Sequence, residues 1–221
     1  MRVLVVLTVG LTLATGCAGT YAQTDLVRAE RADRNVLREA TDVAVVWYAP
    51  PAPTFSGYVD ERSIEIRTQT GIEAPLERVR DRVVARLAGP LGYPVVQRRP
   101  PVMVANDTVE ALRASVTSPL VLDFRTTSWG VANLRSGGRA GGKPNPEDPM
   151  YTHHFVRARL VQLSDGKTLW SAVCGLRGYP GDETVQLQQL TANGGVALRQ
   201  KLTAAADRCA DELVEFFQGA E

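Results

Sequence analysis

The most specific chemical signal in this sequence is the cysteine at position 17. Cys17 directly follows Leu13-Ala14-Thr15-Gly16, a leucine and three small residues at the end of a short apolar run. This arrangement is typical of a lipobox, where the thiol of a bacterial prolipoprotein is acylated and the chain is then cut just before the cysteine. We therefore predict that Cys17 becomes the first residue of the mature protein and carries acyl chains.

The residues before Cys17 have the composition of an export signal. Met1-Arg2 provides positive charge, and residues 3–13 form an apolar run of about 11 residues, within the ~7–15 of a secretory signal and below the ~20 that span a bilayer. A plain signal peptide cut near Ala18 or Ala22 is the alternative. We expect residues 1–16 to be a lipoprotein signal peptide and residues 17–41 to be a lipidated tether. Ala18 rather than aspartate after the cysteine is similar to lipoproteins sorted to the outer membrane, on its periplasmic face.

The two remaining cysteines, Cys174 and Cys209, are an even number in an exported chain, which favours a structural disulfide. A redox enzyme is not expected, because the sequence contains no Cys-x-x-Cys motif. Cys209 falls on the apolar stripe of a helix predicted from about residue 196 to residue 217. Cys174 falls on the apolar face of a predicted hairpin, so the two thiols are expected to meet.

The only histidines, His153 and His154, are adjacent in a predicted strand, where neighbouring side chains point to opposite faces. A metal site would need Glu147 or Asp148 as well, and none is predicted. The sequence has no Gly-x-Ser-x-Gly motif and no nucleotide-binding glycine loop. We predict no catalytic residue, no metal and no cofactor. The alternative is a periplasmic small-ligand binder or hydrolase that uses His153 or His154 beside a glycine- and proline-rich loop at residues 136–149.

Four charged residues are predicted to share one face of the sheet: Asp123, Arg125, Arg157 and Arg159. Residues 120–129 alternate apolar and polar positions, as in a strand with one wetted face. Residues 155–163 and 167–176 form a hairpin whose turn is either a two-residue loop or a three-residue loop with a bulge. The three-residue loop opposes Leu160 with Trp170, Ala158 with Ala172 and Val156 with Cys174, and it leaves both arginines on the face of Asp123. We interpret this face first as solvated and second as a partner-binding face.

The other elements complete a single periplasmic α+β domain at residues 42–221. We expect strands at 43–47 and 93–96, a helix at 75–88, and a second helix that Asp107 caps and that ends near residue 116. The arginines of the first helix are interpreted as a solvated face rather than an anion site. The predicted fold is a mixed or antiparallel sheet with helices on one or both faces, closed by the long C-terminal helix.

Composition excludes some classes of protein. The chain has 221 residues, 44% of them hydrophobic, with 25 Lys+Arg against 24 Asp+Glu. The hydrophobic content is enough for a core, and the charge balance argues against nucleic acid as a partner, which would require a basic stripe.

The order of predicted elements from residue 43 resembles the periplasmic α+β domains of several outer-membrane lipoproteins. These are the lipoprotein activators of peptidoglycan synthases, the curli-secretion lipoprotein and the amino-terminal domain of the Tol-Pal β-propeller protein. Gly166-Lys167-Thr168-Leu169-Trp170, followed by residues 198–213 with Cys209, also resembles an uncharacterised family of proteobacterial outer-membrane lipoproteins. The resemblance implies a fold and a location, and it implies no activity.

These observations together predict an outer-membrane-anchored periplasmic lipoprotein that is not an enzyme. We expect it to act as an adaptor or accessory subunit in envelope assembly or transport. Its expected partners are the membrane, through the N-terminal lipid anchor, and an envelope protein. The sequence does not predict the oligomeric state, although self-assembly through a sheet edge near Pro50 or Ile64 is a further alternative.

Overall fold

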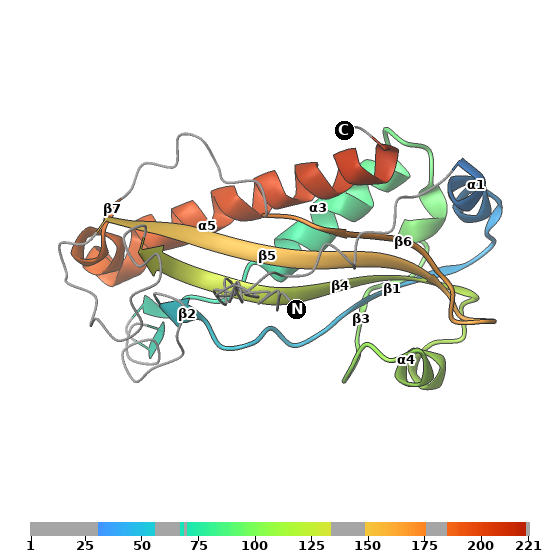
Figure 1. Cartoon of the computed structure of the whole chain (residues 1–221), viewed down its shortest axis with the longest axis horizontal. Helices are drawn as coiled ribbons and strands as arrows, with labels where there is room; N and C mark the ends of the chain where they lie inside the picture. The colour runs from blue at the N-terminus through green and yellow to red at the C-terminus, as the bar shows by residue number, and fades with distance from the viewer. Residues whose placement is uncertain (1–30, 56–66, 69, 134–148, 176–184, 220–221) are drawn as a thin grey trace, which may run out of the picture.

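A computed structural model describes residues 31–55, 67–68, 70–133, 149–175 and 185–219 of the chain. These residues form one seven-stranded mixed sheet in the order β3-β1-β4-β5-β6, with β2 paired to β4 and β7 paired to β5 (Figure 1). β1 runs parallel to β3 and β4, whereas β4, β5 and β6 are antiparallel to one another. The strands are β1 (Val43–Trp47), β2 (Thr54–Phe55), β3 (Val102–Met103), β4 (Leu120–Asn133), β5 (Pro149–Gln162), β6 (Thr168–Val173) and β7 (Val185–Gln186).

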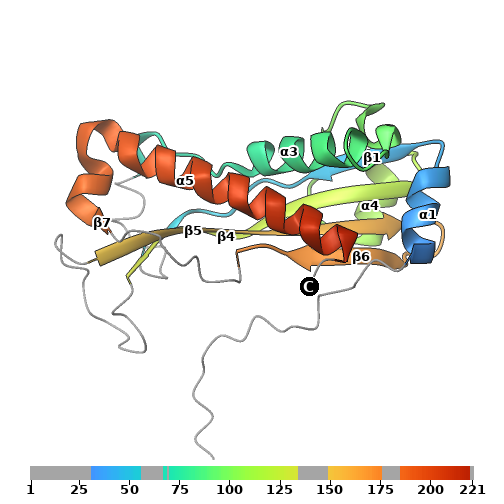
Figure 2. The ribbon, with the colours of Figure 1, turned by 90° about the horizontal axis from the view of Figure 1, so that it is seen from above.

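Helices cover both faces of this sheet, so the predicted α+β fold is confirmed. α3 and α5 lie side by side across one face, and α4 lies on the other (Figures 1 and 2). The helical elements are α1 (Arg31–Glu39), α3 (Leu76–Ala88), the 3-10 turn η2 (Pro94–Gln97), α4 (Val109–Ser115) and α5 (Leu187–Gln218). Among the helices of the described residues, none is both long enough and apolar enough to cross a membrane.

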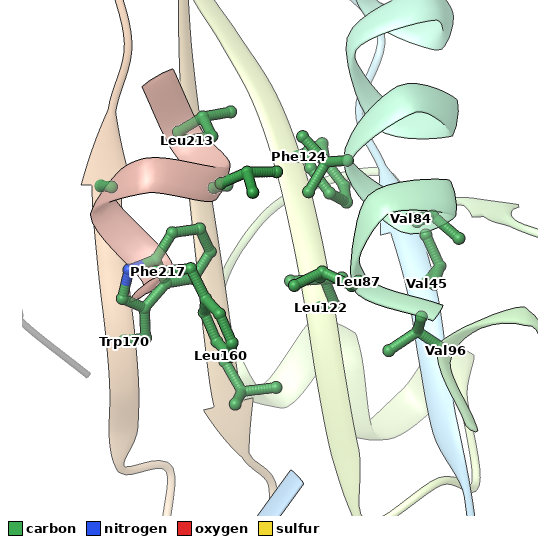
Figure 3. Packing of buried hydrophobic residues seen from close by; sticks show 14 of the residues in the cluster. Val45, Val84, Leu87, Val96, Leu122, Phe124, Leu160, Trp170, Leu213 and Phe217 are labelled. Carbon is green, nitrogen blue, oxygen red and sulfur yellow. The ribbon is translucent and has the colours of Figure 1, made fainter. Parts of the chain in front are cut away.

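The main core lies between β4 and the helices α3 and α5. Leu122 and Phe124 point from β4 toward Leu87 of α3, while Leu213 and Phe217 of α5 close the core over β5 and β6 (Figure 3). Each of these side chains is at most 1% exposed. Burial of a leucine or phenylalanine side chain stabilises a fold by roughly 1.5–3 kcal/mol, which explains why the alternation of β4 decides the arrangement of the layers.

Two elements of the structure differ from the predicted ones. Residues 94–97 form the turn η2 rather than a strand, since Pro94 suits the first position of a helical turn and lacks the amide hydrogen that a strand needs. The cap of α4 is Thr108, whose hydroxyl accepts a hydrogen bond from the Ala111 amide at 3.2 Å. The prediction that Asp107 caps this helix is therefore wrong.

The folded domain begins earlier than the predicted boundary at residue 42. α1 lies within the predicted tether, yet Leu37 is fully buried in the main core. Arg34 donates a hydrogen bond of 2.6 Å to the carbonyl oxygen of Gln218 at the end of α5. The apolar stripe of α1 is too short to be recognised without the surface on which it packs, so only the residues before Arg31 remain as a predicted tether.

The hairpin has the predicted register. Leu160 opposes Trp170 and Ala158 opposes Ala172, and the Cys174 amide donates to the Val156 carbonyl oxygen at 3.0 Å. Gly166 takes the left-handed conformation with φ +77°, as the bulged turn requires. The register shifts by one residue between Leu160 and Val161, so that Val161 opposes Thr168 and the Gln162 amide donates to the Lys167 carbonyl oxygen at 2.9 Å. The connection is then residues 163–166, one residue longer than the predicted three-residue loop.

The closing helix α5 is fastened to the sheet by the Cys174–Cys209 disulfide. The two Cα atoms lie 5.0 Å apart, and both residues are fully buried. α5 begins at Leu187, but its backbone is not helical from Ala192 to Gly195, so the continuous helix starts at Val196 as predicted. The disulfide joins the apolar stripe of this helix to the strand segment that it covers.

We expect the disulfide to contribute a large part of the stability. A closed loop of 35 residues gives about 3–4 kcal/mol in the chain-entropy model, so the double variant Cys174→Ala, Cys209→Ala should lower the free energy of unfolding by about that amount. Mass spectrometry of a non-reduced digest should show the two cysteine peptides linked. Separately alkylated cysteines in freshly isolated protein would contradict the bridge.

Candidate functional site

The most highly charged buried site is built around Asp123 of β4. Asp123 lies directly opposite Arg159 of β5, and its side chain is 0% exposed. Arg159 donates to Asp123 Oδ2 from Nε at 2.9 Å and from Nη2 at 2.5 Å. The hydroxyl of Tyr48, just after β1, donates to the same oxygen at 3.1 Å. The carboxylate is therefore held from both neighbouring strands.

A second carboxylate, Asp107, joins this site from the segment before α4. Its Oδ2 accepts hydrogen bonds of 2.7 Å from Arg125 Nη1 and from Arg157 Nη2. Arg157 Nη2 also lies 3.7 Å from Asp123 Oδ1, and Arg159 Nη2 donates to the Asp107 backbone oxygen at 2.9 Å. We refer to these side chains as the arginine–aspartate cluster, which consists of Tyr48, Asp107, Asp123, Arg125, Arg157 and Arg159.

The electrostatics of the cluster favour its charged form. Burial raises the pKa of the Asp107 carboxyl, but hydrogen bonds from Arg157 and Arg125 outweigh burial and lower the pKa to about 2. Burial raises the pKa of the Tyr48 phenol far above its ordinary value, and the neighbouring Asp123 charge raises it further. Tyr48 therefore stays neutral and acts as a hydrogen-bond donor.

The cluster confirms one prediction and corrects another. Asp123, Arg125, Arg157 and Arg159 do share one face, as the pairings Asp123–Arg159 and Arg125–Arg157 require. The expectation that this face is solvated is wrong for most of it, because the side chains of Asp123, Arg157 and Arg159 are only 0%, 14% and 18% exposed. α4 and the residues around it cover the neighbouring part of this face with a separate apolar cluster that is smaller than the main core. Arg125, at 48% exposure, is the member that faces solvent.

The histidines lie on opposite faces of β5, as predicted, and both are buried. His154 is 1% exposed and lies with Nε2 3.3 Å from the Thr126 hydroxyl on the α5 face. His153 is 7% exposed and lies with Nε2 3.1 Å from Ser128 Oγ and 3.2 Å from Thr54 Oγ1. Burial lowers the pKa of His153 to about 4, and burial together with the His153 charge lowers the pKa of His154 to about 3. Both rings are therefore neutral at pH 7.

His153 Nε2 is shared between two hydroxyl groups. Ser128 Oγ lies 3.1 Å from this nitrogen and Thr54 Oγ1 lies 3.2 Å from it, and the Thr54 hydroxyl also lies 3.3 Å from the Trp129 carbonyl oxygen. Thr54 is held here because Gly130 allows its backbone to come closer than any residue with a Cβ could.

Several predicted site residues lie outside the described residues. These are the lipidation residue Cys17, Glu147 and Asp148 as helpers of a metal site, Ile64, and all of the predicted loop at 136–149 except Pro149. Within the described part of the chain, no group of three or more His, Cys, Asp or Glu side chains is placed to hold a metal ion.

Two features of the surface were not predicted. Arg78 and Arg82 of α3 pair with Asp207 and Asp211 of α5 at 2.7 Å and 3.0 Å, so these arginines join two helices rather than simply facing solvent. A shallow hollow of about 530 Å³ lies between α3 and residues 96–101. In the sequence, this hollow corresponds to the Arg98-Arg99-Pro100-Pro101 run, where two prolines prevent a regular helix or strand.

No protein-family model and no curated protein matches the sequence. Among solved structures, the chain is similar to a PelC dodecamer from Paraburkholderia phytofirmans, with 15% identity, a TM-score of 0.33, and coverage of 80% of this chain and 87% of that one. A putative neuraminyllactose-binding hemagglutinin homolog from Helicobacter pylori has 9% identity, a TM-score of 0.36, and coverage of 80% and 84%. The lipoprotein GNA1162 from Neisseria meningitidis has 15% identity, a TM-score of 0.26, and coverage of 62% and 88%. These likenesses are weak, and they assign neither a family nor an activity.

We expect Asp123→Asn to destabilise the fold by about 3–5 kcal/mol, because the buried Arg159 guanidinium then has no carboxylate partner. The matched control is Arg125→Gln, which breaks a half-exposed pair on the same face and should cost only about 0–1 kcal/mol. Urea denaturation measures both changes. Equal losses in the two variants would show that the cluster is not anchored at Asp123.

The histidines should make stability depend on pH. The pKa values of His153 and His154 are lowered from 6.5 to about 4 and about 3, so between pH 6.5 and 4 the unfolded chain binds protons that the folded chain does not. The contribution of the two histidines to the free energy of unfolding should therefore be constant above pH 6.5 and fall as the pH drops below it. A flatter profile between pH 6.5 and 5 is expected for His153→Gln, His154→Gln, and an unchanged slope in that variant would contradict this assignment.

Proposed function

We propose that this chain is an outer-membrane-anchored periplasmic lipoprotein that acts as a non-enzymatic adaptor or accessory subunit in envelope assembly or transport. The observation that carries the proposal is the buried Cys174–Cys209 disulfide in a chain whose Cys17 follows a short apolar run. Structural disulfides persist in oxidising compartments such as the bacterial periplasm, and they are rare in the cytosol. The disulfide and the lipobox are therefore independent arguments for export.

Acyl chains on Cys17 provide the membrane attachment in this proposal. Each buried methylene of an acyl chain contributes about 0.8 kcal/mol, and several chains together hold a protein firmly at a membrane. The sequence after the cysteine begins with Ala18 rather than aspartate, which supports an outer-membrane rather than an inner-membrane destination.

The adaptor role rests on how the polar groups of the described residues are used. The buried carboxylate of Asp123 and the partly buried carboxylate of Asp107 are paired with arginines, and the two histidines are neutral and lie on opposite faces of the sheet. These groups stabilise the fold and do not converge on a reacting atom. The domain therefore has surfaces to offer to an envelope partner, and its near-neutral net charge of +1 does not favour nucleic acid.

We expect Cys17→Ser to abolish metabolic palmitate labelling and to leave the precursor uncut or released from the membrane, because the acylated thiol is lost. Ala18→Asp is the matched control, which should keep the label and move the protein toward the inner-membrane fraction. Chemical crosslinking in the same membranes should join the acylated protein to an envelope protein, and this product should be lost in Cys17→Ser. Palmitate labelling that survives the Cys17→Ser change would overturn the anchor, and acylated protein without a crosslinked partner would overturn the adaptor role.

A further inference from the structure

A continuous exposed segment runs from the last residue of η2 to the end of β3. Every residue from Gln97 to Met103 is exposed, whereas Val96 before it and Val104 after it are buried. This 97–103 segment contains two arginines, two prolines, valine and methionine, and it contains no acidic residue. Val102 and Met103 are 39% and 60% exposed, and they are two of the four large apolar side chains exposed among the described residues.

The 97–103 segment is attached to the end of the domain through which the N-terminal chain enters. Arg98 Nη1 donates to the Thr41 carbonyl oxygen at 2.6 Å, and Arg99 Nη2 lies 2.8 Å from Asp42 Oδ2. Both partners lie in the short connection between α1 and β1. Figure 1 shows α1 at one end of the molecule and the start of α5 at the other.

The geometry of the segment opposes pairing with a strand of another protein. β3 is the outermost strand beside β1, and it is only two residues long. Pro100 and Pro101 directly before it have no amide hydrogen to donate, so a ladder on this edge cannot extend in that direction. Side-chain contacts, rather than backbone pairing, are therefore available here.

The composition of the segment suits the surface of an anionic membrane. Arginines bind lipid phosphates, and partly exposed apolar side chains insert at the boundary between headgroups and acyl chains. The hollow of about 530 Å³ lies beside these arginines and gives a phosphate headgroup room to approach them. Two carboxylates border the segment, Asp81, which is paired with Arg80, and Asp42, which is paired with Arg99. Among the described residues, Arg98 bonds only to the uncharged Thr41 carbonyl oxygen, so it supplies the net positive charge of the segment, and Arg99 contributes through the donors that Asp42 does not use.

The proposed lipid anchor would keep this surface near the membrane, and the inference rests on that proposed function. Thirteen residues separate Cys17 from α1, and whatever their conformation they span at most about 45 Å. The entry point of the folded domain is then held within that distance of the lipid. We propose that the 97–103 segment is a second membrane contact, in which Arg98 and Arg99 bind anionic headgroups and Val102 and Met103 enter the interface.

The test replaces the acyl anchor by a tether that does not depend on acylation. The mature chain, with a hexahistidine tag in place of Cys17, is held on phosphatidylcholine vesicles that contain a nickel-chelating lipid, with or without phosphatidylglycerol. Met103→Cys carries an environment-sensitive fluorophore, and the native disulfide leaves no other thiol to label. Val196→Cys is the matched control, because Val196 is 45% exposed and lies in α5, away from the 97–103 segment.

We expect the fluorophore at position 103 to brighten on phosphatidylglycerol vesicles and to be quenched by nitroxide-labelled lipid, while the fluorophore at position 196 does neither. Arg98→Gln and Arg99→Gln should each reduce the ratio of membrane-docked to undocked domain by about fivefold. One arginine near an anionic surface contributes about 1 kcal/mol, which corresponds to that factor. The same weak signal at both positions would overturn the contact. A signal at position 103 that appears without vesicles and grows with protein concentration would overturn it in favour of a second copy of the chain. Neither result bears on the lipid anchor at Cys17, which the Cys17→Ser experiment tests separately.

Discussion

The Asp123 carboxylate is fully buried, and its lost hydration must be replaced by hydrogen bonds and ion pairs within the protein. This requirement explains much of the arrangement on one face of the sheet. The effective penalty of burying a charge is several kcal/mol, even after a protein relaxes around it. Arg159 and Tyr48 meet the carboxylate from the two strands that flank β4, so its burial fixes β1 and β5 relative to each other. Asp107 then brings the segment before α4 onto the same arginines. A single buried charge thereby connects three strands and the loop that covers them.

The opposite face, which α3 and α5 cover, is held by apolar burial and the disulfide more than by charged pairs. The pairs between α3 and α5 are exposed, and exposed salt bridges are each worth only about 0–1 kcal/mol, so Arg78 and Asp207 orient the helices more than they hold them. The Trp170 and Phe217 rings meet edge to face with centroids 5.2 Å apart, and they add a second contact between β6 and the helix that the disulfide fastens. Apolar burial and the covalent bridge therefore provide the stability of this face, which leaves the salt bridges free to vary.

The sequence predicted those parts of the fold in which local pattern and tertiary structure agree. The period-2 alternation of Leu122 and Phe124 identified the core face of β4, and the faces of the hairpin selected its register. Asp107 and Thr108 are both good helix caps, and the choice between them depends on arginines that lie far away in the sequence. The burial of Asp123 could not be predicted either, because its cover comes from other elements. The exposure of the 97–103 segment could not be predicted for the same reason, since exposure is a property of the packed domain.

A lipid anchor at one end of a chain limits how far the domain lies from the membrane, but it does not determine which face of the domain is turned toward the lipid. A second contact need not be strong to change this, since a short tether holds the contact at an effective local concentration in the millimolar range. Two arginines and two apolar side chains are then enough to bias one orientation, although they would not bind a membrane by themselves. With the α1 end directed toward the lipid, the start of α5 at the opposite end of the molecule is directed away from the membrane (Figure 1). An adaptor needs this arrangement, in which one end is committed to the membrane and the remaining surface is free for a partner.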